Sequence, residues 1–357
     1  MNPLGTPLSD IAHILSFNSE DTISLEQDIS NENLDWEAIV KLGSKHLIIP
    51  TIYSRLKSKK LLKLLPEDLQ EYLKYIYSLN KERNESLLNE VKHINSWFIK
   101  QNIEHVFLKG AAMIASNYYE DSGERMLGDI DLLVPKEQSE KAFQILVDKG
   151  YTYAKEPTIN PKYFEDKHLL RLASKDYIGA VEVHFKVLDK DQEDLHPKDV
   201  LKDKTFINIT GIPIPHPKHL LIHNILNFQI NDSGSYYNYI GLKNCYDSIV
   251  LLPHLNPKER NELFNNPHIL NNLNLGSLYF KDIPEPPHSI RAAYYRSIYS
   301  LKNRYKAFNS IHYKTLAYLD FSKLLLHRSW FFIINKNYRA DVLNDRERIK
   351  EFIKSKL

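Results

Sequence analysis

The chain has 357 residues, of which 43% are hydrophobic and 26% are charged, which excludes a peptide, a fibrous repeat and an extensively disordered chain. The net charge is only +2, but residues 287–357 carry +10 and residues 1–286 carry −8. Such asymmetry can mark an anionic partner, although solvated helix faces explain it more often.

The N-terminal part of the chain predicts helices. Residues 1–33 are polar and weakly periodic. Asp35 is a plausible N-cap for an amphipathic helix that runs to about Leu56. A second, long helix is expected over residues 66–101, because apolar residues recur there at near-helical intervals after a proline.

The spacing of apolar residues changes at His105, from helical intervals to short apolar runs. Glycine is scarce, at about 3% of residues against a usual share of roughly 7%, so few strands and tight turns are expected. Helices are expected over 111–119 and over 136–149, the second of them ending at Gly150. The expected strands are 105–109, 129–134, 168–173 and 177–187, the last two joined by a hairpin turn.

Prolines 213, 215 and 217 break regular structure and mark a boundary. Helix-like segments follow near 218–229, 238–253, 289–305 and 312–335. The expected fold class is therefore α+β, with a small mixed sheet and mostly helical flanks. We expect three domains: a helical module (1–101), an α/β core (102–212) and a helical region with a basic tail (213–357).

Two carboxylates open the second expected strand. Residues i and i+2 of a strand project from one face, so Asp129 and Asp131 should lie side by side. Like charges this close need a cation, and Mg²⁺ prefers oxygen ligands. About twenty residues earlier, Lys109-Gly110 stands at a helix start, where backbone N–H groups favour a phosphate. Together these elements predict a nucleoside triphosphate site beside a metal.

A third carboxylate would complete this metal site. Strict alternation in Val181–Phe185 places Glu182 and His184 on one face of a strand. Glu182 could share the metal and act as general base toward an acceptor hydroxyl. The alternative is an exposed strand face with ordinary polar residues.

The combination of LKGAAM, Arg125, GDIDLLV, Gly150-Tyr151 and VEVHF resembles the bacterial family of uncharacterised nucleotidyltransferases, within the polymerase-β-like nucleotidyltransferase superfamily. The resemblance covers about residues 35–255. It implies that Asp129, Asp131 and Glu182 are the catalytic metal ligands for two Mg²⁺ ions.

The same resemblance implies a phosphate-binding turn. Lys109, Gly110 and Arg125 match positions of the family that could hold or neutralise phosphate. Ala111 also belongs to this turn, where the superfamily usually has Gly-Ser or Gly-Gly, so a serine hydroxyl is absent. Lys243 either reaches the nucleotide or pairs with Asp247, four residues further along an expected helix.

The expected reaction moves a nucleoside monophosphate from a nucleoside triphosphate, with ATP as the expected donor, to an acceptor hydroxyl with release of pyrophosphate. The acceptor is a small molecule, a peptide or a protein. One alternative is a catalytically weak nucleotide-binding or regulatory protein of the same fold, such as a toxin–antitoxin component, which Ala111 favours. The other is nucleic-acid binding through the basic tail, whose tyrosines alternate with Arg and Lys.

The remaining chemistry-bearing residues favour structural roles. His168 and His184 could line the acceptor side, although a hydrogen-bonded structural histidine is commoner. His219 and His223 lack the glutamate of a metalloprotease helix, so zinc is not expected. The single cysteine, Cys245, is expected in the core.

The cysteine content also bears on the compartment. One cysteine cannot form an intrachain disulfide, which suits a reducing, cytoplasmic compartment. The first residues lack a basic and then apolar leader, and no apolar run reaches the ~18 residues of a spanning helix. Secretion and a membrane partner are therefore not expected.

Overall fold

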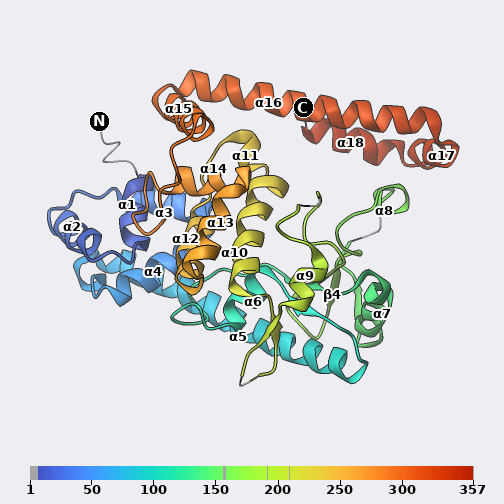
Figure 1. Cartoon of the computed structure of the whole chain (residues 1–357), viewed down its shortest axis with the longest axis horizontal. Helices are drawn as coiled ribbons and strands as arrows, with labels where there is room; N and C mark the ends of the chain where they lie inside the picture. Colours follow the sequence, from blue (N-terminus) through green and yellow to red (C-terminus); the bar gives the residue numbers. More distant parts are fainter. Residues whose placement is uncertain (1–6, 156–157, 191, 209, 357) are drawn as a thin grey trace.

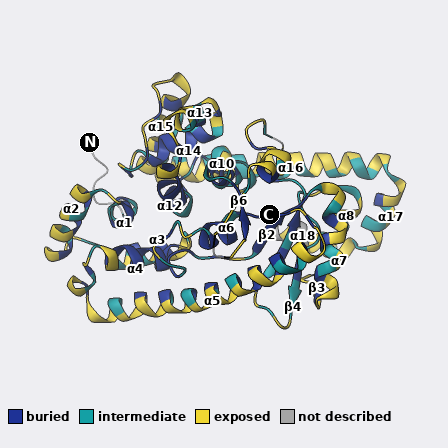
Figure 2. Ribbon diagram, turned by 60° about the horizontal axis from the view of Figure 1, so that its bottom comes forward, coloured by how far each residue is buried: buried dark blue, intermediate teal, exposed yellow. Residues whose placement is uncertain are grey.

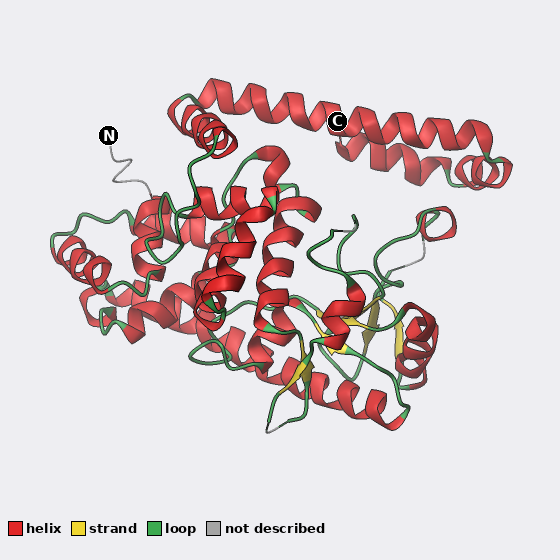
Figure 3. Ribbon diagram, in the orientation of Figure 1, coloured by secondary structure: helices red, strands yellow, loops and turns green. Residues whose placement is uncertain are grey.

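The computed structural model describes residues 7–155, 158–190, 192–208 and 210–356. Helices surround a small mixed sheet (Figure 1, Figure 3), so the predicted α+β fold class is confirmed. Among the helices in these ranges, none combines the length and apolarity needed to cross a membrane.

Five α-helices precede the sheet in the described residues: α1 (Pro7–Leu15), α2 (Ser19–Ser30), α3 (Trp36–Lys45), α4 (Ile49–Ser58) and α5 (Glu67–Lys100). Asp35 caps α3 as predicted, because its Oδ1 accepts a hydrogen bond from the Ala38 N–H at 3.0 Å. The single helix expected up to Leu56 is wrong. Leu47 has a left-handed φ of 56°, and Pro50 suits the first turn of a new helix rather than a helix interior.

The long helix α5 lies along one side of the molecule (Figure 1) and holds the segment that leads into the second strand. Asn80 and Asn84 are buried on α5, and both donate side-chain N–H groups to the Arg125 carbonyl, at 3.1 and 2.7 Å. Arg83 donates to the Gly128 carbonyl at 2.9 Å. Polar residues of α5 therefore fix the backbone just before Asp129.

The same helix also contacts the chain at Tyr151 and Gly179, further along the sheet. Glu90 is buried, and its carboxylate accepts hydrogen bonds from the Tyr151 hydroxyl at 2.6 Å and the Gly179 N–H at 2.9 Å. A side chain at Gly179 would collide with this carboxylate. The turn before Ala180 is therefore attached to α5 as well.

The sheet has the spatial order β1 (Val106–Phe107), β2 (Ile130–Leu133), β5 (Ala180–His184), β4 (Leu172–Ser174) and β3 (Tyr151–Tyr153). β2 and β5 are parallel, and the other neighbours are antiparallel. The hairpin of β4 and β5 agrees with the prediction. β3 was not expected, because it has three residues and only Tyr151 is buried, which gives no clear period.

Four short helices and a two-stranded ribbon surround this sheet: α6 (Lys109–Ala115), α7 (Ser139–Asp148), α8 (Asn160–Tyr163), α9 (Pro197–Lys202), β6 (Thr205–Phe206) and β7 (Pro213–Ile214). α7 ends at Gly150 as predicted, with a φ of +89° that glycine adopts without strain. Pro213 was expected to break regular structure, but it does not. It lies in the two-residue strand β7, where a small ribbon tolerates a missing N–H.

The C-terminal region contains α10 (Pro217–Leu226), a π-helical turn (Asn227–Asn231), α11 (Gly234–Tyr237), α12 (Leu242–Leu251), α13 (Pro257–Glu262), α14 (Pro267–Gly276), α15 (Ile290–Arg304), α16 (Lys306–Ile334), α17 (Lys336–Asn344) and α18 (Arg346–Lys356). Buried hydrophobic side chains from Ile11 to Tyr299 belong to one cluster (Figure 2). The boundaries near residues 101 and 212 remain predictions.

Candidate active site

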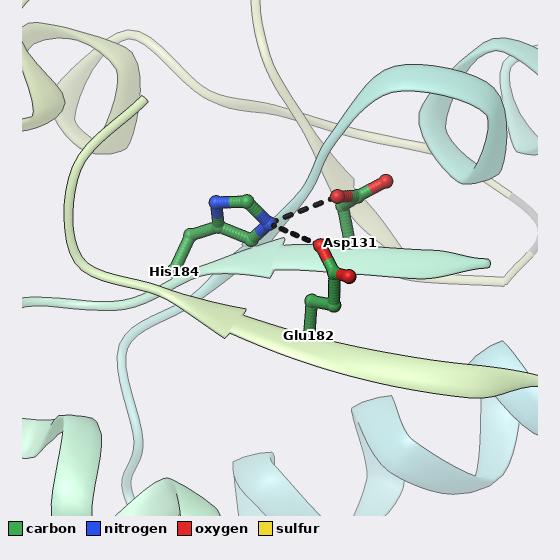
Figure 4. A group of neighbouring side chains, drawn as sticks. All are labelled: Asp131, Glu182 and His184. Carbon is green, nitrogen blue, oxygen red and sulfur yellow. Dashed lines mark hydrogen bonds and ion pairs between the residues drawn. The ribbon is translucent and has the colours of Figure 1, made fainter. Parts of the chain in front are cut away.

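The parallel pairing of β2 and β5 brings two predicted carboxylates together. Asp131 lies opposite Glu182 in the register, and Leu133 lies opposite His184. Figure 4 shows the imidazole of His184 between the two carboxylates. Its Nε2 is 2.9 Å from Asp131 Oδ1 and 3.4 Å from Glu182 Oε2. Asp131 and His184 are fully buried, whereas Glu182 is partly accessible.

Two cations extend this cluster. Lys109, the first residue of α6, places Nζ 2.5 Å from Asp131 Oδ1. The backbone of Lys109 has a φ of 47°, which is unusual for a residue other than glycine. Such a conformation persists where the surrounding structure fixes the backbone. Arg171 bridges the other two carboxylates, with Nη2 3.4 Å from Asp129 Oδ2 and Nε 3.9 Å from Glu182 Oε1. All three predicted carboxylates therefore lie in one cluster.

The local charges set different pKa values for the carboxyl groups. Burial raises the pKa of Asp129, and the nearby carboxylates of Asp131 and Glu182 raise it further. Burial alone would also raise the pKa of Asp131, but Lys109 and His184 outweigh it and hold that pKa well below its usual range. Burial opposes a charged His184, yet its two acidic neighbours raise the pKa of the imidazole.

The donor atoms fit a divalent cation. One oxygen each from Asp131 and Glu182 and one nitrogen of His184 lie within 4.8 Å of one another. Carboxylate oxygens suit Mg²⁺ and Mn²⁺, whereas an imidazole nitrogen is a common ligand of other transition metals. Lys109 and His184 both lie within ion-pair distance of Asp131.

The predicted phosphate turn lies at the start of α6, next to this cluster. Gly110 and Ala111 are both buried there. A side chain at Gly110 would collide with the Arg125 guanidinium and the Leu127 side chain. Close packing therefore requires a glycine at this position. Ala111 is fully buried, so its methyl group belongs to the core.

Arg125 and Asp247 form a buried ion pair behind this turn. The guanidinium Nη2 is 2.9 Å from Asp247 Oδ2, and its Nε is 3.1 Å from Asp247 Oδ1. Tyr119 donates its hydroxyl to the same carboxylate. Asp247 thus pairs with Arg125 rather than with Lys243, the partner considered from the sequence.

Lys243 and Asp232 lie on the far side of the candidate site. In the described part of the chain, Lys243 has no hydrogen-bond or ion-pair partner. The nearby Arg125 and burial both lower its pKa. Asp232, which the sequence analysis missed, follows the π-helical turn, and burial raises its pKa although Lys109, Lys167 and Lys243 oppose that shift. An anion placed between these lysines would be stabilised.

The histidines and the cysteine are placed as follows. His219 pairs with Asp203 at 3.3 Å, and His223 is buried with neither ring nitrogen bonded to any described residue. Among the described residues, Asp131, Glu182 and His184 form the group of three side chains that could hold a metal ion, and neither His219 nor His223 belongs to it (Figure 4). Cys245 is buried in the core, as predicted.

Arg171 is the second residue that the sequence analysis missed. It stands one residue before β4 and reaches the carboxylates only because β4 pairs with β5. The sequence carries no spacing signal that would connect an arginine of one hairpin arm with acids of two other strands. Such a contact becomes visible only when the strand order is known.

A family model described as "Uncharacterised nucleotidyltransferase" matches residues 32–275. Among solved structures, the antibiotic-resistance factor ANT(2'')-Ia is similar, with 13% identity and a TM-score of 0.33, covering 49% of this chain and 86% of that chain. No curated protein matches the chain.

Proposed function

Because this chain belongs to the family of uncharacterised nucleotidyltransferases, we propose that it transfers a nucleoside monophosphate from a nucleoside triphosphate to an acceptor hydroxyl. The acceptor oxygen forms a bond to the α-phosphorus, and the bond from that phosphorus to pyrophosphate breaks. The observation that carries the proposal is the cluster of Asp129, Asp131 and Glu182 on two parallel strands beside Lys109.

The three carboxylates are the proposed ligands of Mg²⁺. When bound, divalent cations neutralise the triphosphate and lower the pKa of the acceptor hydroxyl. Asp129 and Asp131 would hold the ions from one strand, and Glu182 would hold them from the next or accept the hydroxyl proton. The role of His184 is to bridge Asp131 and Glu182 and fix their separation.

The phosphates would lie at the start of α6. Lys109 and Lys243 are the cations that we assign to the triphosphate, with the backbone N–H groups of Gly110 and Ala111. The Arg125 guanidinium is paired with Asp247, so we assign it to holding the turn at Gly110 from behind. ATP is the donor to test first, and the cytoplasm is the compartment we propose.

A second candidate is a protein that binds nucleotide without turnover. Ala111 supplies no hydroxyl to a phosphate, and Lys109 and His184 lie within ion-pair distance of Asp131, where they compete with a metal ion. Both features weaken the case for rapid chemistry while leaving the phosphate-binding cations in place.

The first experiment is a calorimetric titration of the purified chain with non-hydrolysable triphosphates of each base, with and without Mg²⁺. The test variant is Asp129→Ala/Asp131→Ala. A matched control is Asp68→Ala/Asp176→Ala, which removes two exposed carboxylates outside the site. We expect magnesium-dependent binding in the wild type and the control, and its loss in the test variant.

Each outcome separates the two candidates. Magnesium-dependent binding followed by pyrophosphate release in an acceptor screen would support transfer. Binding without release from any hydroxyl acceptor would favour the second candidate. Equal binding by the wild type and Asp129→Ala/Asp131→Ala would contradict the site itself.

A further inference from the structure

The C-terminal helices lie outside the family match, which ends at residue 275. α16 is 29 residues long, every one of them is described, and none is buried. It runs along the edge of the molecule (Figure 1), and Figure 2 shows its residues as exposed or intermediate. A helix in a globular protein normally buries one face, whereas no residue of α16 is buried within this chain.

The inner side of α16 is identified by its contacts. The Leu316 carbonyl accepts a hydrogen bond from the Tyr236 hydroxyl at 3.0 Å. The Arg328 guanidinium lies 3.6 Å from the Phe164 ring centre, and Phe331 packs against the same ring. These contacts attach α16 to α11 and to the segment after α8.

The opposite side of α16 is apolar. Leu326, Ile333 and Trp330 are 73%, 65% and 62% exposed. At 100° per residue, the apolar side chains on this side fall within an arc of about 120°. The members of this arc, which we call the outer face, are Ile311, Tyr318, Leu319, Leu326, Trp330 and Ile333.

Lysines border the outer face on both sides. Lys314 and Lys323 are exposed and fall on the two edges of the arc. α16 has one acidic residue, Asp320, which acts electrostatically on Tyr237 of α11 and so lies on the inner side. Residues 287–357 contain fifteen Lys and Arg and five acids, of which Asp341 bonds to Lys162 and Tyr163 and Asp345 lines the same cavity as Ile333.

We propose that the outer face of α16 binds the surface of an anionic lipid bilayer. An apolar face with Trp and Tyr, bordered by lysines, lies in a membrane interface with its lysines at the headgroups. The sequence analysis expected no membrane partner because no segment can span a bilayer, but a helix in the plane of the surface needs no spanning segment. This proposal does not depend on the proposed catalytic function.

Two other occupants fit the outer face less well. A second copy would bring Lys314 and Lys323 of two molecules together, which like charges disfavour. Nucleic acid needs cations at the point of contact, whereas the centre of the outer face is uncharged. An anionic bilayer satisfies both the apolar centre and the basic borders.

The test is cosedimentation of the full chain with vesicles of phosphatidylcholine alone or of phosphatidylcholine mixed with phosphatidylglycerol. The apolar variant is Leu326→Ser/Trp330→Ser/Ile333→Ser. Its matched control is Ile23→Ser/Ile178→Ser/Phe206→Ser, which removes three similarly exposed side chains elsewhere. The charge variant is Lys314→Glu/Lys323→Glu, and its control is Lys63→Glu/Lys74→Glu.

We expect the wild type and both controls to sediment with phosphatidylglycerol vesicles and not with phosphatidylcholine alone. The apolar and charge variants should each lower the partition coefficient by about ten-fold or more. Circular dichroism checks that all variants fold. No sedimentation of the wild type, or equal sedimentation of wild type and apolar variant, would overturn the proposal.

Two further outcomes would assign the outer face to another partner and also overturn the proposal. One is a wild-type dimer in light scattering that the apolar variant converts to a monomer, without vesicle binding. The other is salt-sensitive association with RNA or DNA, without vesicle binding, that is lost in the charge variant.

Discussion

Two groups of buried charges lie close together in this protein and are balanced in different ways. In the Arg125–Asp247 pair, one guanidinium and one carboxylate satisfy each other, and Tyr119 supplies a further hydrogen bond. In the candidate active site, three carboxylates share Lys109, Arg171 and an imidazole. The first group is a one-to-one pair in the core, whereas the second gathers several titratable side chains in one place. Such a cluster is typical of catalytic sites, and it is the group that we propose for chemistry.

The largest expected effect is on turnover. Asp131→Asn should reduce magnesium-dependent pyrophosphate release by at least about 10²–10³-fold, because it removes a charge that stabilises the transition state. Arg125→Met, compared at a temperature where it remains folded, should lose less. A larger loss in Arg125→Met than in Asp131→Asn would reverse the assignment of the two groups.

The second effect is on stability. Arg125→Met should lower the free energy of unfolding by about 3–5 kcal/mol, because it leaves the Asp247 carboxylate buried without its cation. The double variant Arg125→Met/Asp247→Leu should be more stable than Arg125→Met alone. Urea unfolding of the single and double variants measures both values. Additive losses would show that the two side chains do not form a coupled pair.

A smaller effect tests the contact between the two groups. Gly110→Ala places a methyl group against the Arg125 guanidinium and Leu127, and should cost about 1–3 kcal/mol of stability. Ala112→Gly on the same helix is the control for changes in helix propensity. If Gly110→Ala is as stable as the wild type, Arg125 does not support this turn.

The smallest effect has the opposite sign. The pKa of Asp129 is raised in the folded state by burial and by its acidic neighbours, so its stabilising contribution is present below the ordinary aspartate pKa and is lost as the pH rises. Asp129→Asn should therefore be more stable than the wild type at neutral pH, with a difference that shrinks on acidification. Thermal unfolding across that pH range measures it. A destabilised Asp129→Asn would contradict the charge repulsion inferred for the site.

Strand alternation and helical spacing were enough to predict much of this arrangement. Because a strand has a period of two, Asp131 could be assigned to one face with Asp129, and Glu182 to one face with His184. The long helix α5 could be predicted because its apolar residues recur at helical intervals. Strand order was not predictable from these patterns. Arg171 and Asp232 were therefore missed, since both approach the site through tertiary contacts.

The break between α3 and α4 could not be predicted from the sequence. The left-handed turn at Leu47 depends on the packing of two short helices, and apolar spacing alone continues through it. The exposure of the outer face of α16 could not be predicted either. The helical spacing of its apolar residues suggests core packing, whereas the structure leaves them exposed. Periodicity shows which side chains share a face and does not show what covers that face.

One helix holds the chain just before each of the two strands that carry the carboxylates. α5 holds the approach to β2 through Asn80, Asn84 and Arg83, and the approach to β5 through Glu90. The polar side chains of α5 therefore fix where both strands begin relative to one helix axis. Substitutions on the exposed side of α5 should be tolerated, whereas a shift of one residue along its axis would displace both strands of the candidate site together.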